Sequence, residues 1–114
     1  MEVTLHKRKN VNIVSVKGRM VAVCTMDFEK ILEEQIASGE TLFIFDFSHL
    51  EYISSAGLQC VLMAAKRLEP REGAIALAAL KGTVKEVFEI SGFSSIFPIY
   101  ESVDGALAGD RFSG

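Results

Sequence analysis

The first twenty residues alternate between hydrophobic and polar positions in two short stretches. Val3 and Leu5 alternate with polar neighbours and predict an edge strand. Residues 11–17 alternate again and are rich in β-branched side chains, which favours a second strand that Gly18 is expected to end. The charged residues 7–10 between them predict a solvated hairpin turn.

Apolar residues recur at helical spacing in four later stretches, at residues 25–39, 54–68, 83–92 and 102–108. Thr25 is expected to cap the first of these helices. Thr83 and Glu86 form a capping box before the third. Gly39 and Gly92 follow the first and third stripes, as is typical of a helix end.

Continuous apolar runs at residues 42–45 and 74–79 predict strands that are buried on both faces. A last strand is predicted at residues 96–100, where Pro98 confines it to a sheet edge. Because strands and helices alternate after the hairpin, we expect an α/β fold with a mixed sheet of about five strands and three to four helices packed on it. Neither a linker nor a repeat divides the chain, so residues 1–114 are expected to form a single domain with a frayed tail at 109–114.

Composition narrows the class of protein. The chain has 114 residues and a net charge of −3, with 12 basic and 15 acidic side chains and no basic block. Nucleic-acid binding rests on clustered Lys and Arg, so this function is disfavoured. No apolar run reaches membrane-spanning length, and the N-terminus lacks a signal-peptide pattern. We therefore expect a cytoplasmic protein without a membrane partner.

Two adjacent serines, Ser54 and Ser55, stand where a strand and a short loop lead into the second predicted helix. A nucleophile elbow needs small residues two positions before and two positions after its serine. The residue two positions before Ser54 is Tyr52, and the residue two positions before Ser55 is Ile53, so both are large. Only Gly57, two positions after Ser55, fits the requirement. The pattern therefore disfavours a hydrolase, which we keep as a third alternative.

The sequence also shows no clear pattern for a base-activated serine, a metal site or a phosphate-binding loop. A serine nucleophile needs a base, and His6 and His49 are the only histidines, with His49 six residues before Ser55. The histidines share no ligand spacing with Cys24 and Cys60, so no metal is expected. Both cysteines are expected to be reduced, buried thiols. No glycine-rich phosphate loop follows a strand, and we predict neither a cofactor nor an enzymatic activity.

The serine pair has two interpretations. One serine can simply cap the helix, which contributes about 0.5–2 kcal/mol. Two hydroxyls are one more than a cap needs, and a helix N-terminus favours a phosphate through its free N–H groups. A phosphate would bring a charge of about −1.5 to −2 next to the apolar residues Leu50, Tyr52 and Ile53. A partner packed on that surface would then be released.

Residues 46–48 and 52–58 together resemble the signature of the STAS domain of bacterial anti-sigma factor antagonists. Supporting blocks at residues 18–20, 74–79 and 87–93 extend the resemblance over nearly the whole chain. It implies a partner-switching regulator whose unphosphorylated form binds an anti-sigma factor that is also a serine kinase, freeing that kinase's other client. The kinase phosphorylates one serine at the start of the second helix, and a serine phosphatase reverses the modification.

By this resemblance Ser55 is the phosphorylated residue, since Gly57 and Leu58 align with the family's Gly-Leu pair. Ser54, where many members have Asp, is the second choice. The resemblance also implies a partner-binding set around the serines. These residues are Met20, Val21, Ala22, Val23, Asp46, Leu50, Tyr52, Ile53, Ser54, Ser55, Ala56, Gly57 and Leu58.

The apolar stretch at residues 20–24 is either a buried connector or an exposed rim for interaction. Many relatives carry Asp where Val21 stands, so this chain is expected to present a more apolar rim, which bears on the identity of its partner. The same stretch supports an alternative function, a sensory or scaffold STAS protein that binds a small ligand or forms a weak homodimer.

Overall fold

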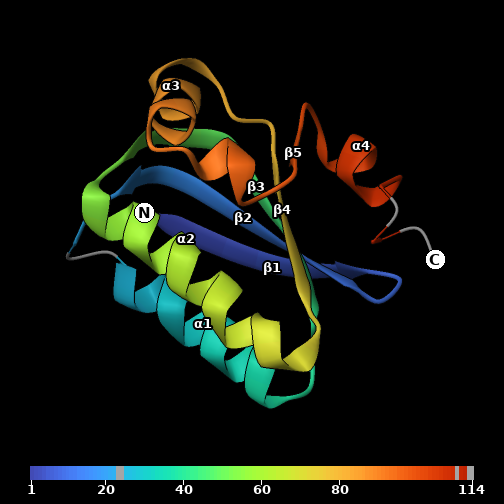
Figure 1. Ribbon diagram of the computed structural model, residues 1–114. Coiled ribbons are helices and arrows are strands. Elements are labelled where there is room, and N and C mark those ends of the chain that lie inside the picture. Colours follow the sequence, from blue (N-terminus) through green and yellow to red (C-terminus); the bar gives the residue numbers. More distant parts are fainter. Residues whose placement is uncertain (23–24, 110, 113–114) are drawn as a thin grey trace.

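A five-stranded mixed sheet with helices on both faces forms the molecule (Figure 1). The computed structural model describes residues 1–22, 25–109 and 111–112. The strands follow the order β1-β2-β3-β4-β5, in which β1 and β2 are antiparallel and the other neighbours are parallel. The elements are β1 (Glu2–Arg8), β2 (Val11–Met20), α1 (Thr25–Ala37), β3 (Leu42–Ile53), α2 (Ser55–Leu68), η2 (Glu69–Arg71), β4 (Ala74–Ala78), α3 (Gly82–Ile90), η3 (Phe93–Ser95), β5 (Ile99–Tyr100) and α4 (Val103–Leu107). The α/β fold predicted from the periodicity is confirmed.

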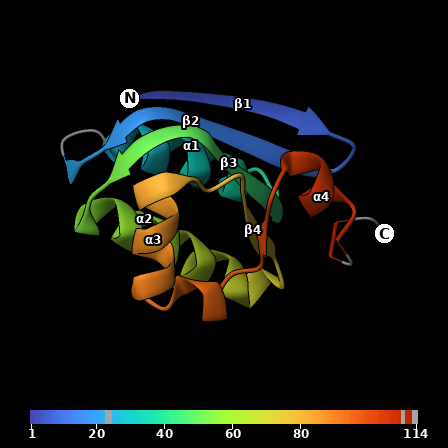
Figure 2. The same cartoon turned by 90° about the horizontal axis from the view of Figure 1, so that it is seen from above.

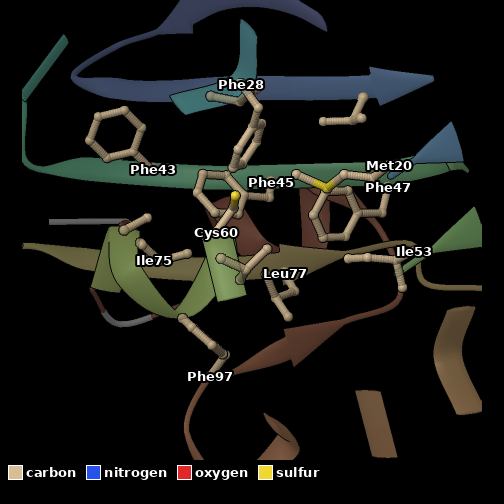
Figure 3. Packing of buried hydrophobic residues seen from close by; sticks show 14 of the residues in the cluster. Met20, Phe28, Phe43, Phe45, Phe47, Ile53, Cys60, Ile75, Leu77 and Phe97 are labelled. Atoms are coloured by element: carbon tan, nitrogen blue, oxygen red, sulfur yellow. The ribbon is translucent and has the colours of Figure 1, made fainter. Parts of the chain in front are cut away.

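The helices α1, α2 and α3 cover one face of the sheet, and α4 covers part of the other (Figures 1 and 2). The main core lies under α1–α3, where β3 contributes Phe45 and Phe47 (Figure 3). A row of six phenylalanine rings crosses this core with centroids 5.2–6.0 Å apart, within the range of favourable aromatic contacts. The rings belong to Phe28, Phe45, Phe47, Phe88, Phe93 and Phe97.

A smaller core lies under α4 and contains Ile44, Ala106 and Phe112. Phe112 is only 6% exposed, and Arg111 Nη2 donates a hydrogen bond of 3.1 Å to the carbonyl of Glu72. The expectation of a frayed tail is therefore wrong for these two residues. An aromatic side chain anchors them, because burying it removes a large apolar area from water.

The predicted end of the second strand at Gly18 and the short loop predicted before the serines are both wrong. β2 continues through Gly18 to Met20, and β3 continues to Ile53. The pairing of the two strands shifts twice, between Ser15 and Lys17 and again at Gly18, which has a φ of +100°. Such bulges let a strand change which side chains face the core without ending it. A simple alternation pattern therefore misses this part of the ladder.

Three further local predictions differ from the structure. Thr25 is the first residue of α1, and its hydroxyl donates to the carbonyl of Ala22. α3 begins at Gly82 after an N-cap, Lys81, that makes no side-chain cap bond, so the Thr83 capping box is wrong. The last strand covers only residues 99–100, because η3 and the turn that buries Phe97 take up the residues before it. Its place at the sheet edge is confirmed.

The hairpin turn between β1 and β2 consists of residues 9–10. The prediction of a turn over residues 7–10 is therefore wrong for Lys7 and Arg8, which end β1 and whose charges are paired. Lys7 lies 2.7 Å from Glu40, and Arg8 lies 2.9 Å from Asp104. Asn12, which is 2% exposed, donates to Glu40 Oε1 at 2.9 Å. The bonds from Lys7 and then from Asn12 hold the pKa of Glu40 below its usual value. The charged side chains of the hairpin therefore make contacts within the fold.

Candidate functional site

Ser54 and Ser55 have separate roles at the start of α2. Ser54 is the N-cap, with an extended backbone (φ −89°, ψ 173°), and its Oγ accepts the N–H of Gly57 at 3.3 Å. Ser55 is the first residue of the helix, and its side chain is exposed. The cap therefore uses one hydroxyl and leaves the other accessible.

The electrostatics at this end of α2 suit an added negative charge. The helix has 14 residues, no acidic residue in its first turn, and Lys66 and Arg67 in its last turn. The first N–H groups of a helix have no partner within it, and the aligned peptide dipoles place partial positive charge there. A charge on Ser55 would gain about 0.3–1 kcal/mol from this dipole.

The end of β2 is held directly against the start of α2. The Ser54 N–H donates to the Met20 carbonyl at 3.0 Å and continues the ladder in which Met20 pairs with Ile53. A Cβ added at Gly57 would lie 2.7 Å from Ile53 Cγ1 and 3.1 Å from the Met20 carbonyl oxygen. Glycine is needed here because the helix approaches the strands too closely for a larger residue. The segment after Met20 therefore begins beside the serine.

The residues predicted to bind a partner fall into two groups by exposure. Four of them are buried and support the site from below, namely Met20, Leu50, Ile53 and Gly57. Eight others are exposed or half-buried, namely Val21, Ala22, Asp46, Tyr52, Ser54, Ser55, Ala56 and Leu58. Val23 lies outside the described residues, as does Cys24. The interpretation of residues 20–24 as an exposed rim is wrong for Met20, whose side chain is 0% exposed and packs in the main core (Figure 3).

Arg19 contacts Tyr52, one of the predicted partner-binding residues, and the sequence interpretation missed this neighbour. Its Cζ lies 4.5 Å from the centroid of the Tyr52 ring, and the tyrosine is 41% exposed. The two residues are opposite each other in the β2–β3 register, one position before the Met20–Ile53 pair. Only the strand pairing reveals this neighbour. The residues Arg19, Val21, Ala22, Tyr52, Ser55 and Ala56 are called the Ser55 surface below.

Asp46 lies apart from the Ser55 surface. Its neighbours Phe45 and Phe47 face α1–α3, so alternation along the strand directs Asp46 to the opposite face of the sheet. There it accepts hydrogen bonds from Ser15 Oγ at 3.2 Å and from the Ser48 N–H at 3.0 Å. Ile53 is seven residues further along β3, or about 23 Å at the usual strand rise. Asp46 is a framework residue of the sheet and is not brought together with Ser55.

His49, the only histidine that the sequence placed near Ser55, lies on β3. It lines a shallow pocket of about 140 Å³ together with Lys17 and Asp46. Within the described part of the chain, Ser55 does not line this pocket and makes no hydrogen bond to His49. In the described residues, His49 and Ser55 are therefore not paired as a base and its nucleophile.

Cys60, on the α1-facing side of α2, is a buried thiol and donates to Glu29 Oε1 at 2.9 Å (Figure 3). Burial and, second, the bond to Glu29 raise its pKa from 9.0 to about 11. Since the thiolate is the reactive species, the folded protein keeps this cysteine inert. Among residues 1–22, 25–109 and 111–112, no group of three His, Cys, Asp or Glu side chains could hold a metal ion.

We expect Cys60 to be labelled by iodoacetamide far more slowly in the folded protein than in urea at pH 8. The raised pKa also means that Cys60 contributes stability that is present below pH 9.0 and is lost as the pH rises towards 11. Mass spectrometry of the Cys60 peptide measures labelling separately from Cys24. Glu29→Gln is the matched variant and should speed labelling, because it removes the charge that opposes the thiolate. Equal labelling rates in folded and unfolded protein would contradict the assignment.

No helix in the described ranges is both long and apolar enough to cross a membrane. A family model of the STAS domain matches residues 2–106. BtrV of Bordetella bronchiseptica, provisionally named an anti-sigma factor antagonist, is 41% identical over 108 residues, which are 95% of this chain and 93% of BtrV. The anti-sigma-B factor antagonist of Listeria monocytogenes is 31% identical over 99 residues, covering 86% of this chain and 85% of the relative.

Solved structures of an anti-sigma factor antagonist share the fold. Unphosphorylated SpoIIAA superimposes with a TM-score of 0.75 at 21% identity, covering 99% of both chains. Phosphorylated SpoIIAA from Bacillus gives a TM-score of 0.76 at 20% identity, covering 93% of this chain and 96% of the other. With the family model and the two relatives, these findings show that the chain belongs to the STAS domain family, where it groups with the anti-sigma factor antagonists.

Proposed function

We propose that this protein is an anti-sigma factor antagonist that works by partner switching. In its unmodified form it binds an anti-sigma factor that is also a serine kinase, and phosphorylation of Ser55 releases it. A serine phosphatase restores the binding form. The family membership and the names of the relatives support the regulatory function. We place the protein in the cytoplasm, where such partners act.

One observation carries the choice of Ser55. Of the two adjacent serines, Ser54 is used by the helix as its cap, whereas Ser55 has an exposed hydroxyl at the first helical position. A kinase must reach the oxygen that it modifies, and Ser55 offers that oxygen without unfolding the helix. Modifying Ser54 would instead remove the acceptor for the Gly57 N–H.

The surroundings of Ser55 support a switch in which charge opposes binding. Ala22, Ala56 and the half-buried Val21 give the Ser55 surface an apolar part, and Tyr52 with Arg19 adds a stacked aromatic and cationic pair. Residues such as Tyr and Arg carry much of the binding energy in protein interfaces. A partner that covers this surface would have to remove water from a phosphate of charge about −1.5 to −2, so the complex would loosen.

Phosphorylation of three proteins tests this function: the wild type, Ser55→Ala and Ser54→Ala. Each is incubated with ATP and the anti-sigma-type kinase that the wild type captures, and phosphate is mapped by mass spectrometry. We expect wild type and Ser54→Ala to be modified at residue 55 and Ser55→Ala to stay unmodified. Ser54→Ala also loses a cap worth about 0.5–2 kcal/mol, which urea unfolding measures. Full modification of Ser55→Ala would refute the assignment.

A further inference from the structure

The strand β1 forms an edge of the sheet with little protection. Among the described residues it pairs with β2 alone, and it lies along the outer side of the sheet (Figure 2). Six of its seven residues are exposed, and Leu5 is among the large apolar side chains that reach solvent, at 36% exposure. The outer edge of such a strand presents free N–H and C=O groups that can accept another strand.

We propose that two copies of this chain pair through β1, antiparallel and with Leu5 on the two-fold axis, so that one sheet continues through both protomers. In this register Glu2 of each copy lies opposite Arg8 of the other, and Leu5 lies opposite itself. Thr4 lies opposite His6 in the same way. An isologous interface must be self-complementary, and the strand carries its acidic residue at one end and its basic residues at the other.

The faces from which these side chains project agree with the proposed pairs. Glu2 and Thr4 line the shallow pocket that they share with Asp46, on the sheet face opposite α1–α3. Arg8 reaches Asp104 of α4, which covers that same face. Residues opposite one another in an antiparallel pair interact only when they project from one face, so Glu2 and Arg8 meet this condition.

Charge also selects this register over its neighbours. A shift of two residues towards the hairpin would place His6 opposite itself, and a shift of four would place Lys7 opposite itself. Like charges placed directly opposite are destabilising, so Lys7 opposes the second of these arrangements, and the first lacks the two Glu2–Arg8 pairs. Basic side chains at an edge strand commonly prevent uncontrolled pairing, and the proposed register is the one that pairs Glu2 with Arg8 at both ends of the strand. This pairing does not use the Ser55 surface, so it is independent of the proposed function.

Charge reversal at the two ends of β1 tests the proposal. Sedimentation velocity measures self-association of the wild type at up to about 1 mM protein, the range of weak complexes. We expect Glu2→Arg and Arg8→Glu each to raise the dimer dissociation constant at least about tenfold, because each places two like-charge pairs in the interface. Glu86→Arg, an exposed glutamate of α3 with the same change of charge, is the matched control and should associate as the wild type does.

The decisive sample is an equimolar mixture of the two variants. One then carries arginine at both residues 2 and 8, and the other carries glutamate at both, so every cross-strand pair is attractive and association should return. Circular dichroism confirms that both variants are folded. A wild type that stays monomeric overturns the proposal. So does a mixture that does not associate, or a dimer insensitive to both reversals, which would indicate another interface.

Discussion

Ser55→Asp is expected to weaken binding of the anti-sigma-type kinase by at least about thirtyfold, which corresponds to about 2 kcal/mol. The carboxylate stands at an exposed helical position next to Ala56 and close to the end of β2, where a docked partner would remove its water. A buried charge without a partner costs about 2–5 kcal/mol in an interface, whereas the helix dipole returns less than 1 kcal/mol of that cost. Isothermal titration calorimetry on the two proteins measures the difference.

Ser94→Asp is the matched control for this prediction. Ser94 is an exposed serine in η3, outside the Ser55 surface, and it receives the same change in charge. Its affinity for the kinase should equal that of the wild type. Equal affinities of Ser55→Asp and wild type would show that the interface does not exclude water from Ser55. Binding of the protein to the kinase would then not depend on the charge at residue 55.

Gly57→Ala is expected to lower the free energy of unfolding by about 1–3 kcal/mol, in spite of the better helix propensity of alanine. The added Cβ would stand 2.7 Å from Ile53 Cγ1 and 3.1 Å from the Met20 carbonyl oxygen, and that carbonyl is held by the Ser54 N–H. The start of α2 must therefore move away from the strands. Urea unfolding measures the loss, and we also expect slower phosphorylation of Ser55.

Gly105→Ala provides the control, because Gly105 also lies inside a helix and has no positive φ. The nearest atom to its added Cβ is Ser102 Oγ at 3.2 Å, and the next lies 3.9 Å away. This variant should change the free energy of unfolding by less than about 1 kcal/mol. If Gly57→Ala were as stable as Gly105→Ala, the close approach of α2 to the strands would not be the reason that residue 57 is glycine.

The helices could be predicted from the sequence because their signal is local. Phe28, Leu32 and Ile36 of α1 recur at helical spacing, and all three are buried in the main core. The capping predictions failed for a related reason. A side chain becomes a cap only if the helix begins beside it, and α3 begins one residue before Thr83, which leaves Lys81 at the N-cap.

The strands around the site were predicted less well. Several polar side chains lie between the apolar run at 42–45 and the serines, so a short loop is the local prediction there. Residues 46–53 remain a strand because β2 supplies hydrogen bonds across two shifts in register. A strand is stabilised by a neighbour distant in sequence, and a local pattern contains no information about that neighbour.

For the site, the sequence by itself determined that two hydroxyls stand at a helix start next to small residues, and it disfavoured a nucleophile elbow and a metal site by their spacing. The tertiary structure decided which of the two serines caps the helix. The extended backbone of Ser54 and its bond to the Gly57 N–H make it the cap, and Ser55 remains exposed.

The tertiary structure also removed Asp46 from the neighbourhood of the serine and placed Arg19 against Tyr52. Arg19 meets Tyr52 because two strands pair in one particular register, which places residues 33 positions apart in contact. The amino-acid order determines the periodicity of each element and the chemistry of its residues. Which surfaces meet depends on long-range hydrogen bonding and core packing, so the composition of the Ser55 surface was decided by the fold.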